Sequence, residues 1–269
     1  MGLATKAALQ KESSMKLVCE IDPAFESDQA SRQESFDRNE DKCFAFSPEH
    51  LEELCAENNV TPQDKMDILI DFTNADALFT TALWCVKHGI HLVSGSTGLS
   101  EEKTEELKTL FAGQGTPNCV LAPNFSISAL LLMHLSAIAA PYFDSVEIIE
   151  FHHDEKKDAP SGTAVATARH ITAALEKAGS ILRPDPTEVE KIPGSRGATA
   201  DYGIKIHAVR LHGLVAHEEV LLGSTGQSLT LRQDSYDRTS FMPGVILAVK
   251  SVSETPGLTV GLEKLLNLS

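Results

Sequence analysis

Two histidines and a lysine lie close together in the stretch 150–164. His152 and His153 are adjacent, and Lys156 follows on the same stretch. An imidazole exchanges protons near neutral pH, and an ammonium group supplies a positive charge; both suit acid–base chemistry on an anion. Any one of these residues alone is more often structural than catalytic. Because they occur together, they predict a site that handles protons on a small anionic ligand.

A Ser-Gly-Thr turn at 161–163 follows these residues. Pro160 and Ser161 suit the start of a helix, and Gly162 would let the backbone approach a ligand closely. The free N–H groups at a helix N-terminus bind carboxylate or phosphate. A turn of this composition is often only a helix cap. Next to the histidines, however, it predicts an anion-binding site.

The flanking segments would position both groups. Residues 146–149 form an apolar run typical of a buried strand, and residues 165–178 predict a helix that ends at Gly179. Side chains alternate between the two faces of a strand. His152 and His153 should therefore point in opposite directions if the strand extends through them, one into a cleft and the other along its wall.

Strands and helices alternate through the first half of the chain. We expect strands at 16–21, 43–46, 66–72, 90–94 and 118–122. We expect helices at 1–14, from a Ser47 cap to 57, at 75–87 and after a Ser100 cap. This alternation indicates an α/β fold with a mostly parallel sheet, whose ligand should lie at the carboxyl ends of the strands. The turn at 95–98 lies at such an end, although an ordinary strand-to-helix turn could have the same sequence.

The second half has a different pattern. A helix is expected at 128–140, and strands at 204–211, 218–222 and 228–233 are separated by glycine turns. This is an α+β arrangement with an open mixed sheet. A last helix is expected at 239–252 and a short tail at 258–266, whereas the acidic segment 24–42 is interpreted as a surface excursion.

The composition disfavours several classes of partner. The 269 residues carry a formal net charge of −15, which argues against nucleic acid and anionic membranes. No apolar run could span a bilayer, and the N-terminus lacks the apolar core of a signal peptide. The five cysteines are scattered and indicate reduced thiols of a cytoplasmic protein. No metal site is predicted, since the neighbouring residues 152–155 cannot easily converge on one ion.

The stretch 150–164 closely resembles the signature of the 4-hydroxy-tetrahydrodipicolinate reductase (dihydrodipicolinate reductase) family. The pattern is Glu-x-His-His-x-x-Lys-x-Asp-Ala-Pro-Ser-Gly-Thr-Ala, and every fixed position is present. Asp71-Phe72-Thr73, the turn at 95–98, the segment 122–126 and Arg238 also lie where the family has related residues. The resemblance therefore covers nearly the whole chain.

This resemblance implies a fold, an activity and an assembly. The fold would be α/β, with a Rossmann-like dinucleotide-binding domain (1–123 and 239–269) and an α+β domain (124–238) for substrate binding and oligomerisation. The activity would be hydride transfer from NADH or NADPH to 4-hydroxy-tetrahydrodipicolinate, a small dicarboxylate, in lysine and diaminopimelate biosynthesis. The assembly would be a cytoplasmic homotetramer.

The resemblance also implies roles for individual residues. His152 would be the acid/base residue and Lys156 the second proton donor. His153, Gly162 and Thr163 would bind the carboxylates of the substrate. The nicotinamide end of the cofactor would be held by residues of two loops, namely Gly95, Ser96, Thr97, Ala122, Pro123, Asn124 and Phe125.

The chain departs from the family pattern at its beginning. The family opens with a strand and a Gly-x-x-Gly-x-Met-Gly loop, of which Met1-Gly2 matches only the end. That strand is central in a doubly wound sheet, so its loss would remove the pyrophosphate-binding loop and a row of ladder hydrogen bonds. Either the sequence is incomplete, or the chain is a degenerate, non-catalytic relative that binds a dicarboxylate without cofactor. We favour incompleteness, because a non-catalytic chain has little reason to keep the whole signature.

Asp22 is the candidate for the cofactor's ribose. It ends the strand expected at 16–21, where an acidic residue of a dinucleotide fold bonds the ribose 2′-OH. Family members that accept NADPH often have an arginine next, but here the next residue is Pro23, and Glu26 would repel a phosphate. Two alternatives stay open: Asp22-Pro23 is only a turn, or an arginine at 32 or 38 supplies the missing charge.

We therefore expect the full-length enzyme to use NADH at least as well as NADPH. Pro23→Arg should shift the preference toward NADPH, because a guanidinium can pair with the 2′-phosphate. Steady-state kcat/KM with each cofactor measures this. A clear NADPH preference in the unmodified enzyme would contradict it.

Overall fold

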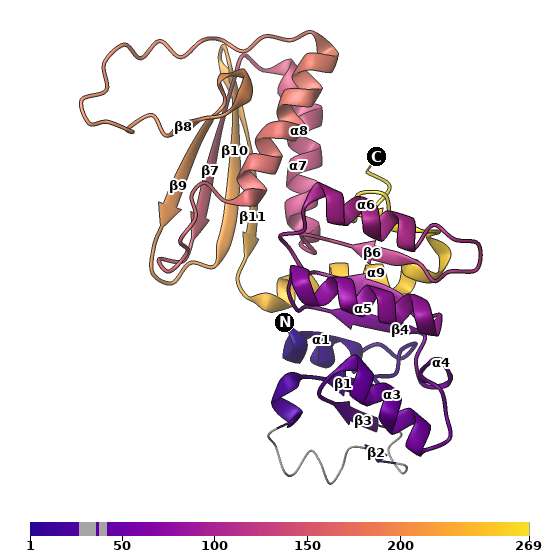
Figure 1. Ribbon diagram of the computed structural model, residues 1–269. Helices are drawn as coiled ribbons and strands as arrows, with labels where there is room; N and C mark the ends of the chain where they lie inside the picture. Colours follow the sequence, from indigo (N-terminus) through magenta and orange to yellow (C-terminus); the bar gives the residue numbers. More distant parts are fainter. Residues whose placement is uncertain (27–35, 38–41, 269) are drawn as a thin grey trace. The chain divides into compact units, whose positions relative to one another are not determined.

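The computed structural model describes residues 1–26, 36–37 and 42–268 (Figure 1). The chain divides into two compact units, residues 1–125 with 241–269, and residues 126–240. Most of the expected acidic excursion at 24–42 lies outside the described residues. No described helix has both the length and the apolar character needed to cross a membrane. All five cysteines are free thiols, as predicted.

The strands of the first unit form two sheets. The smaller sheet has the order β1 (Cys19–Ile21), β3 (Lys42–Ala45), β2 (Phe36–Asp37), with β1 and β3 parallel. The larger sheet is wholly parallel, in the order β12 (Leu258–Val260), β6 (Cys119–Leu121), β5 (His91–Ser94), β4 (Ile68–Asp71). The expected parallel pairing is confirmed. The expected single sheet is divided, because no described backbone forms a ladder between β1 and β4.

Helices alternate with these strands as the sequence predicts. They are α1 (Gly2–Leu9), α3 (Pro48–Glu57), α4 (Pro62–Lys65), α5 (Ala75–His88), α6 (Glu101–Leu110) and α9 (Met242–Ser251). The expected caps are present: Ser47 Oγ accepts from the His50 N–H at 3.1 Å, and Ser100 Oγ from the Lys103 N–H at 3.2 Å. Buried side chains of both sheets pack into one apolar cluster, which therefore holds the unit together.

The second unit is an open mixed sheet covered on one face by two helices (Figure 1). Its strand order is β11 (Gln227–Ser235), β10 (Ala216–Ser224), β7 (Ser145–His152), β9 (Lys205–Arg210), β8 (Ala198–Thr199). Only β7 and β9 are parallel. The helices are α7 (Ile127–Ala139) and α8 (Gly162–Ala178). Apolar residues of α7, α8 and the facing strands form the core.

Several boundaries differ from those expected. β7 continues to His152, and α8 begins at Gly162. The helix expected at 1–14 ends at Leu9, and the strand expected at 16–21 begins at Cys19. The expected tail at 258–266 contains β12, because residues 258–260 pair with β6. Hydrophobic periodicity cannot reveal a three-residue strand whose partner is far away in the sequence.

Gly244 lets α9 pack against the segment 122–125, at Phe125. A Cβ at this position would overlap the carbonyl oxygen of Phe125 and lie 3.1 Å from Leu262 Cδ1. The backbone of Phe125 cannot rotate away as a flexible side chain could. The absence of a side chain at Gly244 therefore fixes where the segment 122–125 lies in this unit.

Gly244→Ala should lower the free energy of unfolding by about 1–3 kcal/mol, the usual cost of overpacking, despite alanine's better helix propensity. Gly2→Ala is the matched control, because nothing lies within 4 Å of a Cβ there. Urea unfolding measures both. Equal stability of the two variants would contradict the close packing.

Candidate active site

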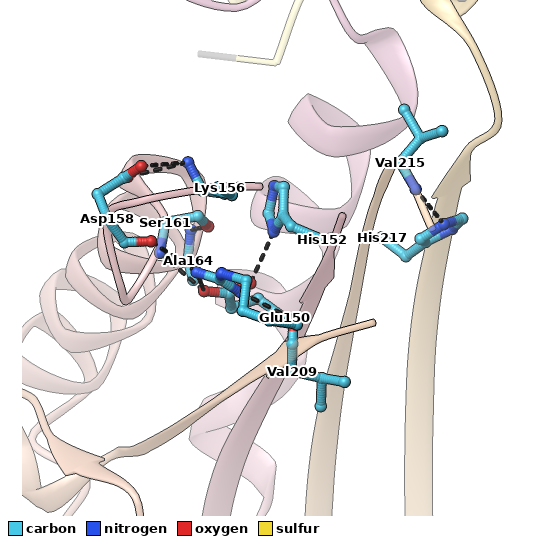
Figure 2. A network of polar contacts seen from close by, with 10 residues as sticks. Glu150, His152, Lys156, Asp158, Ser161, Ala164, Val209, Val215 and His217 are labelled. Atoms are coloured by element: carbon cyan, nitrogen blue, oxygen red, sulfur yellow. Dashed lines mark hydrogen bonds and ion pairs between the residues drawn. The ribbon is translucent and has the colours of Figure 1, made fainter. Parts of the chain in front are cut away.

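His152 lies at the carboxyl end of β7, where its ring is held by a buried carboxylate (Figure 2). Strand alternation places Glu150 and His152 on the same face, and His152 Nδ1 lies 2.6 Å from Glu150 Oε2. The side chain of Glu150 is 0% exposed, whereas that of His152 is 15% exposed. Nε2 of His152 has no protein partner within the described chain, so it is free to meet a ligand.

Glu150 is the centre of a network that the sequence analysis did not identify. Arg210 binds it through two nitrogens, with Nη1 at 2.7 Å from Oε2 and Nη2 at 2.9 Å from Oε1. The backbone N–H of Ser161 donates to Oε1 at 3.0 Å. Burial alone would raise the pKa of Glu150, but Arg210, His152 and the Ser161 N–H outweigh it and hold that pKa below its usual value. Glu150 is therefore an anion at neutral pH.

The environment of His152 favours the neutral imidazole. Burial lowers the pKa of His152, the Glu150 carboxylate opposes this, and the cations of Lys156 and Arg210 lower the pKa further. Below its ordinary value, the group is mainly unprotonated at pH 7. An anionic ligand near the ring would reverse this balance by favouring the imidazolium.

The loop after β7 carries two more of the predicted residues, His153 and Lys156. The ammonium group of Lys156 lies 2.8 and 2.9 Å from the two carboxylate oxygens of Asp158, and it is the main cause of the lowered pKa of Asp158. Arg210 Nη2 donates to the Asp158 carbonyl at 2.7 Å, which ties this loop to the Glu150 network. His153 is exposed. The strand does not extend through His153, so the simple alternation expected for the two histidines stops at His152.

The start of α8 has the geometry of an anion-binding site. Ser161 is the N-cap, and its hydroxyl accepts from the Ala164 N–H at 3.2 Å. The N–H groups of Gly162 and Thr163 have no acceptor in the part of the chain that the structure describes. A Cβ at Gly162 would meet nothing within 4 Å, so the approach is open. The structure thus brings His152, Lys156, Gly162 and Thr163 onto one end of this unit, where their assigned roles stay predictions.

The predicted cofactor loops lie in the first unit. Asp71, which is 3% exposed, accepts from Ser94 Oγ and Ser96 Oγ at 2.7 Å each and from Thr73 Oγ1 at 2.6 Å. It therefore fixes the turn that follows β5. A Cβ at Gly95 would overlap the Phe72 ring and lie 2.9 Å from the Phe125 ring. Only glycine allows this turn to pack against the segment 122–125.

The remaining cofactor candidates differ in exposure. Ala122 and Phe125 are buried, Asn124 is half-buried, and Thr97 and Pro123 are exposed. Asp22 is also exposed, and its Oδ1 accepts from the Ala24 N–H at 2.9 Å. This bond is typical of a turn, the alternative interpretation of Asp22-Pro23. The second carboxylate oxygen has no hydrogen-bond partner among the described residues. The described residues contain no cluster suited to a metal ion.

Comparisons with known proteins agree on one family. The model "Dihydrodipicolinate reductase, N-terminus" matches residues 1–125, and "Dihydrodipicolinate reductase, C-terminus" matches residues 128–266. The 4-hydroxy-tetrahydrodipicolinate reductase of Corynebacterium urealyticum is 50% identical over 204 residues, 76% of this chain and 82% of the relative. That of Mycobacterium marinum is 52% identical over 202 residues, 75% of this chain and 81% of the relative.

Solved structures give the same result. The dipicolinate-bound dihydrodipicolinate reductase of Paenisporosarcina sp. TG-14 superposes with a TM-score of 0.80 at 36% identity, over 98% of this chain and 94% of that chain. An amine dehydrogenase from Mycobacterium smegmatis superposes with a TM-score of 0.56 at 12% identity, over 96% and 91% of the two chains. The second likeness concerns the fold alone.

Removing the cation from Glu150 should destabilise the protein in a pH-dependent way. Glu150 has a lower pKa folded than unfolded, so it stabilises the fold above about pH 4.3, the unfolded value. This stabilisation is lost as the pH falls through the folded pKa. Arg210→Met should therefore lower the free energy of unfolding by about 3 kcal/mol at pH 7, and the difference should shrink toward pH 3.

Arg232→Met is the matched control. Arg232 binds Asp234 and Glu219, but its side chain is 46% exposed, so its loss should cost less than about 1 kcal/mol. Urea unfolding between pH 3 and pH 7 measures both variants. If the two arginines cost the same at pH 7, Glu150 does not depend on Arg210 as described.

Proposed function

The chain belongs to the dihydrodipicolinate reductase family, and from this premise we propose that it reduces 4-hydroxy-tetrahydrodipicolinate with a hydride from a nicotinamide cofactor. The reaction consumes one hydride and one proton, releases water and gives tetrahydrodipicolinate, in lysine and diaminopimelate biosynthesis. The observation that carries the proposal is the open N-terminus of α8 beside the His152–Glu150 pair. It offers a carboxylate site and a proton donor for one ligand.

The first unit fits a nicotinamide cofactor. Its turn at 95–97 lies at the carboxyl end of parallel strands, is fixed by Asp71, and exposes Thr97 to solvent. A nicotinamide bound there supplies the hydride, while the protein supplies orientation and charge. The residues that would hold it are Gly95, Ser96, Thr97, Ala122, Pro123, Asn124 and Phe125. Asp22 would bind the ribose.

The second unit would bind the dicarboxylate and deliver the proton. One substrate carboxylate would accept from the N–H groups of Gly162 and Thr163, with His153 nearby on the loop. These negative charges favour the imidazolium of His152, which then takes up a proton and donates it to the ring as the hydride arrives. Glu150 holds Nδ1, so that Nε2 faces the substrate. Lys156 is the second donor.

Three features of the proposal come from the family resemblance. We infer a homotetramer, a cytoplasmic location and use of either NADH or NADPH. The dicarboxylate is the expected small-molecule partner, and the net charge of −15 supports the exclusion of nucleic acid. The distinction between the two nucleotides depends on Asp22 and Pro23.

Loss of either proton donor should slow turnover. His152→Gln or Lys156→Ala should lower kcat by about 10²–10⁴-fold with little effect on the KM for cofactor, because acid–base groups act in the transition state. The exposed His170 on α8 gives the control variant His170→Gln. Oxidation of the nicotinamide, followed by absorbance, measures all three. Near-normal turnover in both donor variants would remove the assigned roles, and dicarboxylate binding without any reduction would favour a non-catalytic relative.

A further inference from the structure

A second buried carboxyl group lies directly across the sheet from Glu150. Glu218 on β10 is the register partner of Glu150 on β7, and it is 2% exposed. Its partner on the other side is Gln233 on β11, which is 8% exposed. A row of three buried polar side chains thus crosses the sheet on its helix-covered face, and its first member holds His152.

Glu218 has no cation of its own in the described part of the chain. β7 contributes Glu150, α8 contributes the hydroxyl of Thr167, and β11 contributes the neutral Gln233. α7, which also packs on β10, brings no charge that acts on Glu218. The guanidinium of Arg210 is bound to Glu150, and Oε1 of Glu218 has no hydrogen-bond partner.

A carboxyl group in these surroundings keeps its proton to an unusually high pH. Burial disfavours the charged form, and the nearby Glu150 carboxylate repels a second negative charge, although the Thr167 hydroxyl partly opposes both. Together they raise the pKa of Glu218 to about 7. The charge of Glu218 therefore changes within the pH range in which His152 must exchange a proton.

We propose that Glu218 is a positioning residue for the reaction, acting through Glu150 to set the pH range in which His152 holds its proton. Below about pH 7, Glu150 and Glu218 together carry one negative charge, which lies on Glu150. When Glu218 ionises, the pair carries two, and the second charge favours the imidazolium. Glu218 thus keeps His152 able to donate at a higher pH than Glu150 alone would allow. This inference rests on the proposed function, which gives His152 its task.

The test replaces the carboxyl by an amide of the same shape. Glu218→Gln should lower the pKa of His152 by up to roughly 0.5 unit, because the part of a negative charge that Glu218 carries while His152 titrates is lost. Glu219→Gln is the control: it is the next residue on β10, points to the opposite face and binds Arg232. Carbon-13 NMR of labelled histidines follows the titration, with the His152 signal assigned from His152→Gln. The NMR titration needs no turnover, so the role of Glu218 can be refuted independently of the proposed activity.

Activity gives the second measurement. The basic limb of the pH profile of kcat/KM should move to lower pH in Glu218→Gln and stay in place in Glu219→Gln. An unchanged His152 titration in Glu218→Gln, or the same shift in both variants, overturns the proposal. If Glu218→Gln does not fold, infrared titration of the unmodified protein decides. The absorption band of a buried protonated carboxyl group should be present at pH 5 to 6 and disappear near pH 7. If that band is absent at pH 5 to 6, the proposal is overturned equally.

Discussion

The second unit depends on one buried anion, the carboxylate of Glu150. Its side chain is 0% exposed, so the water it loses must be replaced by donors. The donors are the Arg210 guanidinium, the His152 ring and the Ser161 N–H. They come from β9, β7 and the start of α8. Satisfying one charge therefore fixes the register of two strands, the position at which the helix begins and the orientation of the His152 ring.

The first unit uses a carboxylate in the same way. Asp71 is almost fully buried and is satisfied by the hydroxyl groups of Ser94, Ser96 and Thr73. These bonds hold the turn after β5 in the shape that brings Gly95 against Phe125. In both units a buried carboxylate therefore fixes the position of a loop through its hydrogen bonds.

The sequence predicted what local patterns control. The Ser47 and Ser100 caps, the alternation of the first half and the strand–loop–helix around His152 are found. Contacts that need register were missed: Arg210 reaches Glu150 only because β9 lies parallel beside β7. Glu150 itself could have been found, since a two-residue spacing from His152 places both on one face. The division of the first unit into two sheets depends on which strands meet, which hydrophobic periodicity does not encode.

The central claim is that a dicarboxylate binds beside His152 at the open start of α8. Calorimetric titration with dipicolinate at pH 7, in buffers of different ionisation enthalpy, tests it most directly. We expect net proton uptake on binding, because two carboxylates raise the pKa of a ring that burial keeps neutral in the free protein. The uptake should vanish in His152→Gln. Binding with no proton exchange, or with the same uptake in that variant, would contradict the account.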